Sequence, residues 1–478
     1  MNKPISTSGE SLEHGRSIVF RHGIVLTMDD NHRILKDGDV LIVDGVIREV
    51  GTNIQAPADA LEIDAKGGIL MPGMIDTHRH MWQTAMRAYG ADWTLSQYFV
   101  WYYLEYGKNF RPQDVYAGNL LSAIEAVDAG VTTSVDWSHG LQTPEYADAA
   151  VDALESVAGR FVLGYGNIQA APWEWTADPG FRDFYNRRIH GKTDKLGFQL
   201  AFDVVAGPEF PEKAAFEVAR ELGVSVNTHA GVLGANGDDS IRLMHEHGFM
   251  TPDTILVHCA TLSDDSYQRI AASGSSVSVS TESEQSAGQG YPSSWKLRQF
   301  DIPITLSHDT SVWWSADLFT AMRTTLGADR SRQHLEAHLK GETVTQLDLR
   351  SEEVIDWATR GGSRALGLDS LIGSIEVGKR ADVVLLKNDE SPVMFPIVNP
   401  YGHVAMQAQR ADVHTVVVNG NILKHEHRLI GIDLAKARSV VEETVSHLES
   451  TLGEEAWEAG MHPALAPKEI IDNPYKYV

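Results

Sequence analysis

Gly68-Ile-Leu-Met-Pro-Gly-Met-Ile-Asp-Thr-His-Arg-His80 is the stretch that decides the fold, because an apolar strand ends there in two histidines two residues apart. Side chains alternate faces along a strand, so His78 and His80 project the same way and both imidazoles can converge on one ion. Three further strand-like runs end in a potential ligand at the same kind of boundary: Val224–His229, Thr254–His258 and Ile302–Asp309. The pattern predicts a metal site assembled at the ends of several strands.

Composition sets the outer limits on fold and function. A chain of 478 residues exceeds the usual size of a single core, so we expect one large domain and a smaller one. The formal charge of -25 repels phosphate backbones and anionic lipid, which argues against nucleic acid as a partner. The only cysteine, Cys259, excludes an intrachain disulfide and suits a reducing cytoplasm. No secretory signal and no apolar stretch long enough to cross a membrane is recognisable, so we expect a cytoplasmic protein with a small-molecule substrate.

Both ends of the sequence have the texture of a small β module. Short strand-like runs with turn signals such as Asp44-Gly45 occur near the N-terminus and return after Gly378. Because isolated hairpins seldom stand alone, we expect one discontinuous β-sandwich domain built from both termini. The runs are residues 18–20, 24–28, 39–43 and 46–50, then 381–386 and 413–420.

Between these ends, strand-like runs alternate with helical ones. Residues 117–129 read as a helix before a strand over 131–136, and residues 211–222 as a helix before a strand over 224–229. This repetition predicts an α/β fold, a (β/α)8 TIM barrel whose active site lies at the carboxyl ends of its strands. The expected division is 1–68 for the first part of the β-sandwich domain, 69–365 for the barrel, and 366–478 for the second part with C-terminal helices, one over 433–452.

Several further motifs accompany the His78-Arg79-His80 start: Gln83 with Arg87, the strand Gly130–Asp136, and the closing runs Gly373–Asp382 and Val416–Gly420. With them the chain resembles the amidohydrolase superfamily, in the branch of cytosine, guanine and adenosine-type deaminases and triazine hydrolases. The resemblance extends over nearly the whole chain. It implies a homo-oligomer, a dimer or a tetramer.

The resemblance also implies a ligand set: His78, His80, His229 and Asp309 would hold one divalent metal ion, zinc or alternatively iron or cobalt. His258 would stand beside the water that the ion activates, and Asp309 would accept a proton from it. The fourth barrel strand, within Gln199–Val205, offers no lysine that could bridge two ions, which favours a single metal.

One departure from the family pattern concerns the residue three positions after His229. The resembled deaminases normally carry a glutamate there to protonate the ring nitrogen, and this chain has Val232. Candidate replacements are Glu282 and Glu284, which we place at the end of the seventh strand, where two close carboxylates would raise one pKa. For substrate contacts we expect side chains close in sequence to the ligands: Trp82, Gln83, Trp137, His139 and Trp313.

The function predicted from these residues is a mononuclear metal-dependent hydrolase that attacks a C–N or C–X bond of a small planar heterocyclic or aromatic compound. One alternative is a metal-dependent lyase or C–C bond hydrolase on the same scaffold. Another is a non-catalytic scaffold, which the four filled ligand positions disfavour.

Overall fold

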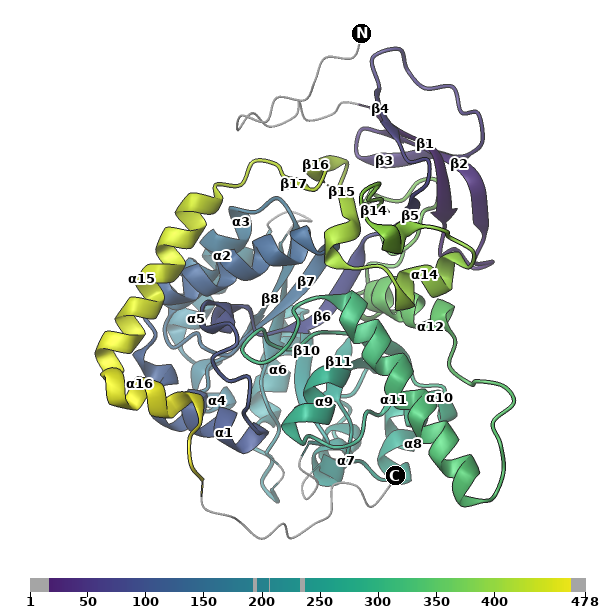
Figure 1. Ribbon diagram of the computed structural model, residues 1–478. Helices are drawn as coiled ribbons and strands as arrows, with labels where there is room; N and C mark the ends of the chain where they lie inside the picture. The colour runs from purple at the N-terminus through teal and green to yellow at the C-terminus, as the bar shows by residue number, and fades with distance from the viewer. Residues whose placement is uncertain (1–16, 192–195, 206, 233–236, 466–478) are drawn as a thin grey trace.

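The computed structural model describes residues 17–191, 196–205, 207–232 and 237–465. Its centre is an eight-stranded parallel sheet in the order β13-β12-β11-β10-β9-β8-β7-β6 (Figure 1). The first and last strands meet at their carboxyl ends, where the His80 amide donates to the Asp309 carbonyl at 2.8 Å and the Asp309 amide to the His78 carbonyl at 3.1 Å. The predicted (β/α)8 barrel is therefore confirmed. Its strands are β6 (Met74–Arg79), β7 (Val131–Ser138), β8 (Arg160–Tyr165), β9 (Leu196–Ala201), β10 (Ser225–Ala230), β11 (Thr254–His258), β12 (Ser276–Val279) and β13 (Ile304–Leu306).

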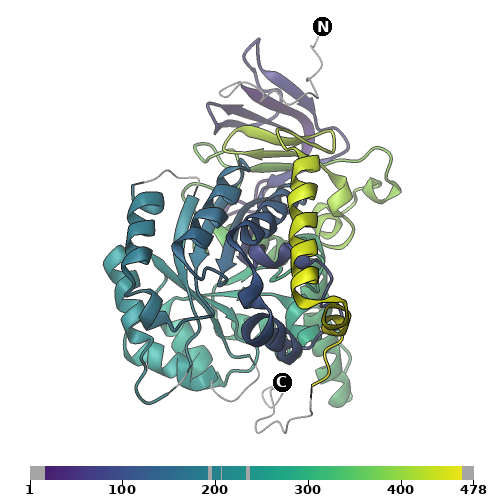
Figure 2. The same cartoon turned by 90° about the vertical axis from the view of Figure 1, so that its left-hand side faces the viewer.

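Helices surround this barrel on the outside (Figures 1 and 2). The long connection after β6 carries the short helix α1 (Leu95–Phe99), which helps to build the pocket described below. The remaining helices between the barrel strands are α2 (Pro112–Asp128), α3 (Pro144–Glu155), α4 (Pro172–Trp175), α5 (Pro179–Phe184), α6 (Lys213–Leu222), α7 (Gly237–Glu246), α8 (Asp264–Ser273), α9 (Thr281–Ala287) and α10 (Ser294–Gln299). After the last strand come α11 (Leu318–Leu339), α12 (Ser351–Asp356) and α13 (Gly362–Ala365).

The C-terminal region returns along the outside of the barrel. Figure 2 shows α15 lying lengthwise beside the barrel helices, with α16 below it. Thr444 of α15 donates to the Asp114 carboxylate of α2 at 2.8 Å, which fixes this helix against the barrel. Asp433 caps the helix by accepting from the Lys436 amide, so the expected helix over 433–452 starts one residue later. These helices are α14 (Pro400–Met406), α15 (Leu434–Leu452) and α16 (Glu454–Met461).

The β module is one hydrogen-bonded sheet of nine strands drawn from both ends of the chain. The halves join where β14 pairs antiparallel with β5. Buried residues of both halves, including Phe20, Val40, Leu385 and Val417, share one apolar core. The strands are β1 (Ile18–Leu26), β2 (Ile34–Val43), β3 (Val46–Gly51), β4 (Leu61–Asp64), β5 (Ile69–Pro72), β14 (Val383–Leu386), β15 (Val413–Val418), β16 (Asn421–His425) and β17 (Arg428–Leu429).

The boundary between the two domains lies later than residue 68, because β5 belongs to the β module and the barrel begins with β6. The domain boundary cannot be recognised in the sequence, because residues 69–75 form one apolar run. The chain changes sheets at Gly73, where a Cβ would lie 2.1 Å from the Thr132 hydroxyl oxygen. Only glycine lets the backbone approach the neighbouring strand so closely.

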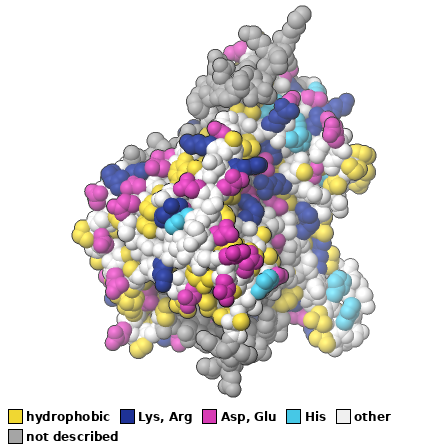
Figure 3. Space-filling view, turned by 60° about the vertical axis from the view of Figure 1, so that its left-hand side comes forward, with side chains coloured by type: hydrophobic (Ala, Val, Ile, Leu, Met, Phe, Trp, Pro, Cys, Tyr) yellow, Lys and Arg dark blue, Asp and Glu magenta, His cyan; other side chains and the backbone are white. Residues whose placement is uncertain are grey.

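The surface carries both signs of charge. Acidic and basic side chains are interspersed over the face seen in Figure 3. Among the described residues, no helix combines the length and the apolar character that crossing a bilayer requires.

Candidate metal centre and active-site pocket

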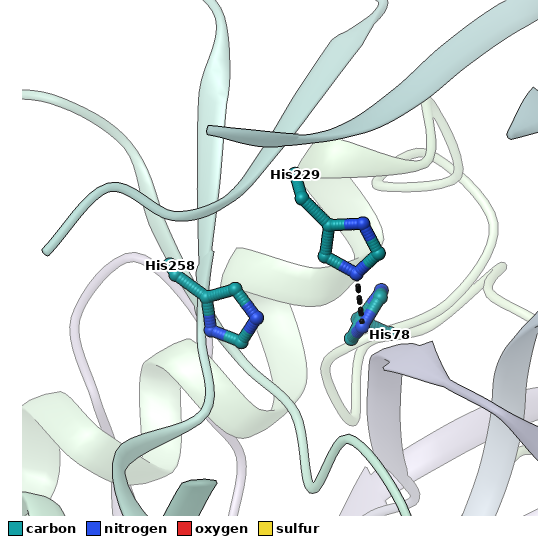
Figure 4. Close-up of side chains that lie close together, drawn as sticks. All are labelled: His78, His229 and His258. Atoms are coloured by element: carbon teal, nitrogen blue, oxygen red, sulfur yellow. Dashed lines mark hydrogen bonds between the residues drawn. The ribbon is translucent and has the colours of Figure 1, made fainter. Parts of the chain in front are cut away.

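Four side chains from three separate segments converge at the carboxyl end of the barrel. His78 and His80 come from the end of β6, His229 from β10, and Asp309 follows β13. The Asp309 Oδ1 lies 3.4 Å from the His78 Nε2 and 3.3 Å from the His80 Nε2. The Nε2 atoms of His78 and His229 are 3.2 Å apart, as the dashed line in Figure 4 shows. The structure thus brings together the four ligands that the resemblance implies.

Hydrogen bonds on the far sides of two rings show that this donor set fits a cation. The Nδ1 of His80 donates to the Trp137 carbonyl at 2.9 Å, and the Nδ1 of His229 to the Asp203 carboxylate at 2.7 Å. With Nδ1 as the donor, each ring has its Nε2 on the side of the centre, as metal-ligating histidines do. Three imidazoles and one carboxylate around a common point are a typical zinc donor set.

The electrostatics of the centre favour the metal-binding protonation states. Burial lowers the pKa of His80 to about 4, and burial together with the neighbouring His80 and His229 lowers that of His78 well below its ordinary value. Burial acts to raise the pKa of Asp309, but its contacts with His78 and His80 outweigh burial and hold the pKa well below the usual range. Near neutral pH, His78 and His80 are therefore neutral imidazoles and Asp309 is a carboxylate, the forms that bind metal. Burial acts to lower the pKa of His229, but the charge and hydrogen bond of Asp203, with the charge of Asp309, raise it.

Two of the polar residues at the centre have left-handed backbone conformations. His258 has φ 73° and Asp309 has φ 71°. Residues with a Cβ adopt such angles at a cost of about 1–3 kcal/mol, and they persist where the surroundings enforce them. The strain bends the chain just where β11 and β13 end, which points both side chains toward the centre.

His258 stands next to the ligands with a carboxylate behind it. One of its nitrogens lies within 4.8 Å of the nitrogens that His78 and His229 offer, and its ring is parallel to that of His229 (Figure 4). Its Nδ1 faces the Glu284 Oε1 at 3.3 Å. Glu284 is fully buried and also accepts from the Ser280 amide. Glu284 therefore holds the ring of His258 and does not reach the pocket.

The expectation that Glu282 and Glu284 end the seventh strand is wrong. The strand β12 stops at Val279, and both glutamates lie in the helix α9, where residues two apart point in different directions. Glu282 accepts from the Ser315 hydroxyl at 2.7 Å and lies outside the residues that line the pocket. Glu282 is therefore not placed to act on a ligand in the pocket.

Glu282 gives a pH-dependent prediction. Burial raises its pKa to about 7, with a further rise from the Asp317 charge, so the folded state favours its neutral form. The buried neutral carboxyl contributes its full stabilisation of the folded state below pH 4.5, which is the ordinary pKa of the group. This stabilisation is lost as the pH rises toward 7. In wild type, we expect the free energy of unfolding to decline between about pH 5 and 8, and we expect Glu282→Gln to make this decline smaller. Urea titrations at several pH values measure this effect. The kcat/KM of the variant should be unchanged. An equal decline in wild type and variant would contradict this assignment, and the exposed Glu246→Gln serves as control.

A pocket of about 270 Å³ opens onto the metal centre. It reaches His80, His229, His258 and Asp309, so a ligand in it touches the reacting centre directly. Its walls are mainly aromatic and apolar, with a few polar groups. These wall residues are Leu95, Tyr98, Phe99, Tyr103, Asp203, Val204, Ala230, Gly231, Val232, Gly237, Ser240, Gln289 and Trp313.

Of the expected substrate contacts, only Trp313 lines this pocket. Trp82 and Gln83 are fully buried, Trp137 packs on the His229 ring with 4.3 Å between ring centroids, and His139 lies behind the pocket wall. Nearness in sequence to a ligand was a poor guide, because a side chain adjacent to a strand-end ligand points into the barrel wall as often as into the mouth. The aromatic wall comes instead from α1 and the segment after it.

Asp203 is the polar residue that the sequence did not reveal. It follows β9 by two residues, lines the pocket and holds the Nδ1 of His229. Burial acts to raise its pKa, but the charge and hydrogen bond of His229 prevail and lower it. Its position just after a barrel strand is the signal that could have identified it.

Asp203→Asn is expected to weaken zinc binding by about 10–100-fold, because the orienting charge behind a histidine ligand is lost while the shape is kept. Competition with a chromophoric chelator measures the dissociation constant. Asp183→Asn, an exposed carboxylate paired with Arg187 at the surface, is the control. Equal zinc affinity in the Asp203 variant and the wild type would show that Asp203 does not orient the ligand.

Comparison with known proteins agrees with this geometry. The family model described as Amidohydrolase family matches residues 69–423. A 5'-deoxyadenosine deaminase of Methanosarcina acetivorans is 28% identical over 453 residues, covering 90% of this chain and 98% of the relative. The crystal structure of an adenosine deaminase from Xanthomonas campestris with bound zinc has a TM-score of 0.75 at 21% identity, covering 91% and 99% of the two chains. A triazine hydrolase from Arthrobacter aurescens has a TM-score of 0.78 at 21% identity with the same coverage.

A closed (β/α)8 barrel with three imidazoles and a carboxylate at the mouth defines a metal-dependent hydrolase. The chain belongs to the amidohydrolase family, and the ends of its barrel strands bring together side chains that could hold a divalent ion.

Proposed function

We propose that this protein hydrolyses the exocyclic C–N bond of an aminated planar heterocycle presented as a neutral nucleoside, with 5'-deoxyadenosine as the first compound to test. One observation carries the proposal: an aromatic pocket leads directly to the candidate metal centre, where it reaches His80, His229 and Asp309. Tyr98, Phe99, Tyr103 and Trp313 offer ring faces to a flat substrate. The deaminases of adenosine-type compounds among the relatives support the same class.

The charge of the pocket selects among adenosine derivatives. Among its described lining residues there is neither lysine nor arginine, while Asp203 contributes a carboxylate. A phosphate or carboxylate on the substrate would lose its hydration without gaining a cationic partner. The pocket therefore suits an uncharged nucleoside and disfavours the corresponding nucleotide.

Different residues of the chain are placed for different steps of the reaction. When bound, the divalent ion supplies Lewis-acid activation of water, whose pKa falls to about 7 on zinc. Asp309 is placed to take the proton that this water loses, and its other oxygen accepts from the Ser283 hydroxyl, which holds the carboxylate in place. His258, held by Glu284, lines the pocket beside these ligands. The apolar wall at Val232 gives the substrate nitrogen no carboxylic acid.

Ammonia release from a small panel tests the proposal. Zinc-loaded protein is mixed with 5'-deoxyadenosine, adenosine, adenosine 5'-monophosphate and an aminated triazine, and ammonia is measured by a coupled assay. We expect the neutral nucleosides to be hydrolysed and kcat/KM for the monophosphate to be about 100-fold lower. Ammonia from the triazine alone would refute the nucleoside assignment, and carboxylate or CO2 release from other substrates would indicate the lyase or C–C hydrolase alternative. A dimer or tetramer remains a prediction for size-exclusion chromatography with light scattering.

A further inference from the structure

An aminated heterocycle in this pocket would need a hydrogen-bond donor for its ring nitrogen, and Val232 on the pocket wall offers none. Negative charge accumulates on a ring nitrogen when water adds to the neighbouring carbon, and a donor aimed at that nitrogen stabilises it. A tyrosine hydroxyl lies at the end of a buried chain of hydrogen-bonded side chains, Trp82–His139–Tyr98. This inference rests on the proposed hydrolysis of an aminated heterocycle.

The hydrogen bond from Trp82 determines which ring nitrogen of His139 carries the proton. The indole nitrogen of Trp82, which can only donate, faces the Nδ1 of His139 at 3.3 Å. The Trp137 carbonyl also lies 3.3 Å from this Nδ1, but it already accepts from His80 at 2.9 Å. Because Trp82 is fully buried, a proton on the Nδ1 would leave its indole hydrogen facing another hydrogen. His139 therefore carries its proton on Nε2.

The hydrogen bond from Thr310 determines which end of the Gln83 side-chain amide faces Tyr98. The Thr310 hydroxyl donates to the Gln83 Oε1 at 3.0 Å, while the Thr310 oxygen accepts from the Val312 amide at 3.2 Å. The Gln83 carbonyl oxygen is thus committed to Thr310. Its Nε2 faces the Tyr98 hydroxyl at 2.7 Å and donates to it.

Both links end on one oxygen. The Nε2 of His139 lies 3.3 Å from the Tyr98 hydroxyl, so this oxygen accepts from His139 and from Gln83. A phenolic oxygen that accepts two hydrogen bonds still has its own hydrogen available to donate. Tyr98 lines the pocket, so that hydrogen has the pocket as its remaining direction.

We propose that Tyr98 is the neutral hydrogen-bond donor that this chain uses on the substrate nitrogen in place of a glutamate at position 232. The hydroxyl keeps its proton throughout, so the proton that the departing ammonia requires comes from the attacking water. Burial, with the charges of Asp309 and Asp203, raises the pKa of Tyr98 well above its ordinary value, against the hydrogen bond of Gln83. The same charges place the phenol within electrostatic reach of the centre. His139 and Gln83 are positioning residues, which act through Tyr98.

The tautomer of His139 tests the premise without any substrate. Zinc-loaded protein is labelled with 15N-histidine, and the His139 signals are assigned by their loss in His139→Gln. We expect the proton on Nε2 and an unprotonated Nδ1. A proton on Nδ1 with an unprotonated Nε2 would make Tyr98 donate to His139 and would overturn the inference.

Kinetics test the role of the hydroxyl. On whichever panel compound is hydrolysed, we expect Tyr98→Phe to lower kcat by about 100-fold with a small change in KM. The matched control loses a neighbouring hydroxyl outside the pocket: Tyr102→Phe, whose buried hydroxyl has no partner among the described residues. This variant is expected to retain kcat within about threefold. A Tyr98→Phe variant as active as Tyr102→Phe would overturn the inference.

The two experiments separate this inference from the proposed function. If no panel compound releases ammonia, the substrate class fails, while a proton on the Nε2 of His139 still supports a hydroxyl hydrogen directed into the pocket. If ammonia is released and Tyr98→Phe matches its control, the function stands and the donor role fails. Equal melting temperatures and zinc contents of Tyr98→Phe and wild type show that a lost kcat is not a folding defect.

Discussion

Asp309→Ala is expected to lose its zinc and to lower kcat/KM by about 1,000-fold or more, because the only carboxylate ligand of the centre is removed. Its Oδ1 lies within 3.4 Å of the His78 Nε2 and within 3.3 Å of the His80 Nε2. Without this charge, three imidazoles, two of them buried, would have to hold a dication alone. Elemental analysis of the purified variant measures the first effect, and the ammonia assay the second.

A thermal readout accompanies this prediction. A ligand that binds only the folded state stabilises it, so wild-type protein should melt at a higher temperature when zinc is added. Asp309→Ala should show no such rise at the same zinc concentration. Glu282→Gln is the matched control, since it changes a half-buried carboxyl near the same mouth that does not reach the pocket. Zinc at full occupancy and wild-type activity in Asp309→Ala would exclude Asp309 as a ligand.

The convergence of these side chains could be predicted because parallel strands in a barrel end at one face. His78 and His80 share a face by strand alternation, and His229 and Asp309 each end or follow a strand. Predicting that these side chains converge requires no detail of side-chain packing. The barrel geometry alone carries residues far apart in the sequence to one point.

The pocket could not be predicted in the same way, because its wall is formed by connections whose path depends on tertiary packing. Tyr98 and Tyr103 belong to the long connection after β6, and nothing in their spacing distinguishes them from the buried Tyr102 and Trp101. The role of Glu284 was hidden because a strand was expected where the chain turns into α9. Short helices after barrel strands have no periodic pattern long enough to recognise.

The family resemblance implies that His258 stands beside the ion and not on it. Among the described residues, two groups could hold a metal, one with His78, His80 and Asp309, the other with His78, His229 and His258. His229 and His258 have nearly parallel rings 5.6 Å apart. We expect His258→Asn to keep its zinc and to lower kcat by about 10²–10⁴-fold, the usual range for a residue that assists proton transfer.

The partner of His258 provides an independent check on this assignment. Glu284 faces its Nδ1 at 3.3 Å and touches none of the pocket, so Glu284→Gln should lower kcat less than His258→Asn while zinc stays bound. The double variant should be no slower than His258→Asn alone, because Glu284 acts through His258. Loss of zinc from His258→Asn would instead make His258 a ligand of the ion. In that case the ring would be committed to the metal, and Asp309 alone would remain to move the proton of the attacking water.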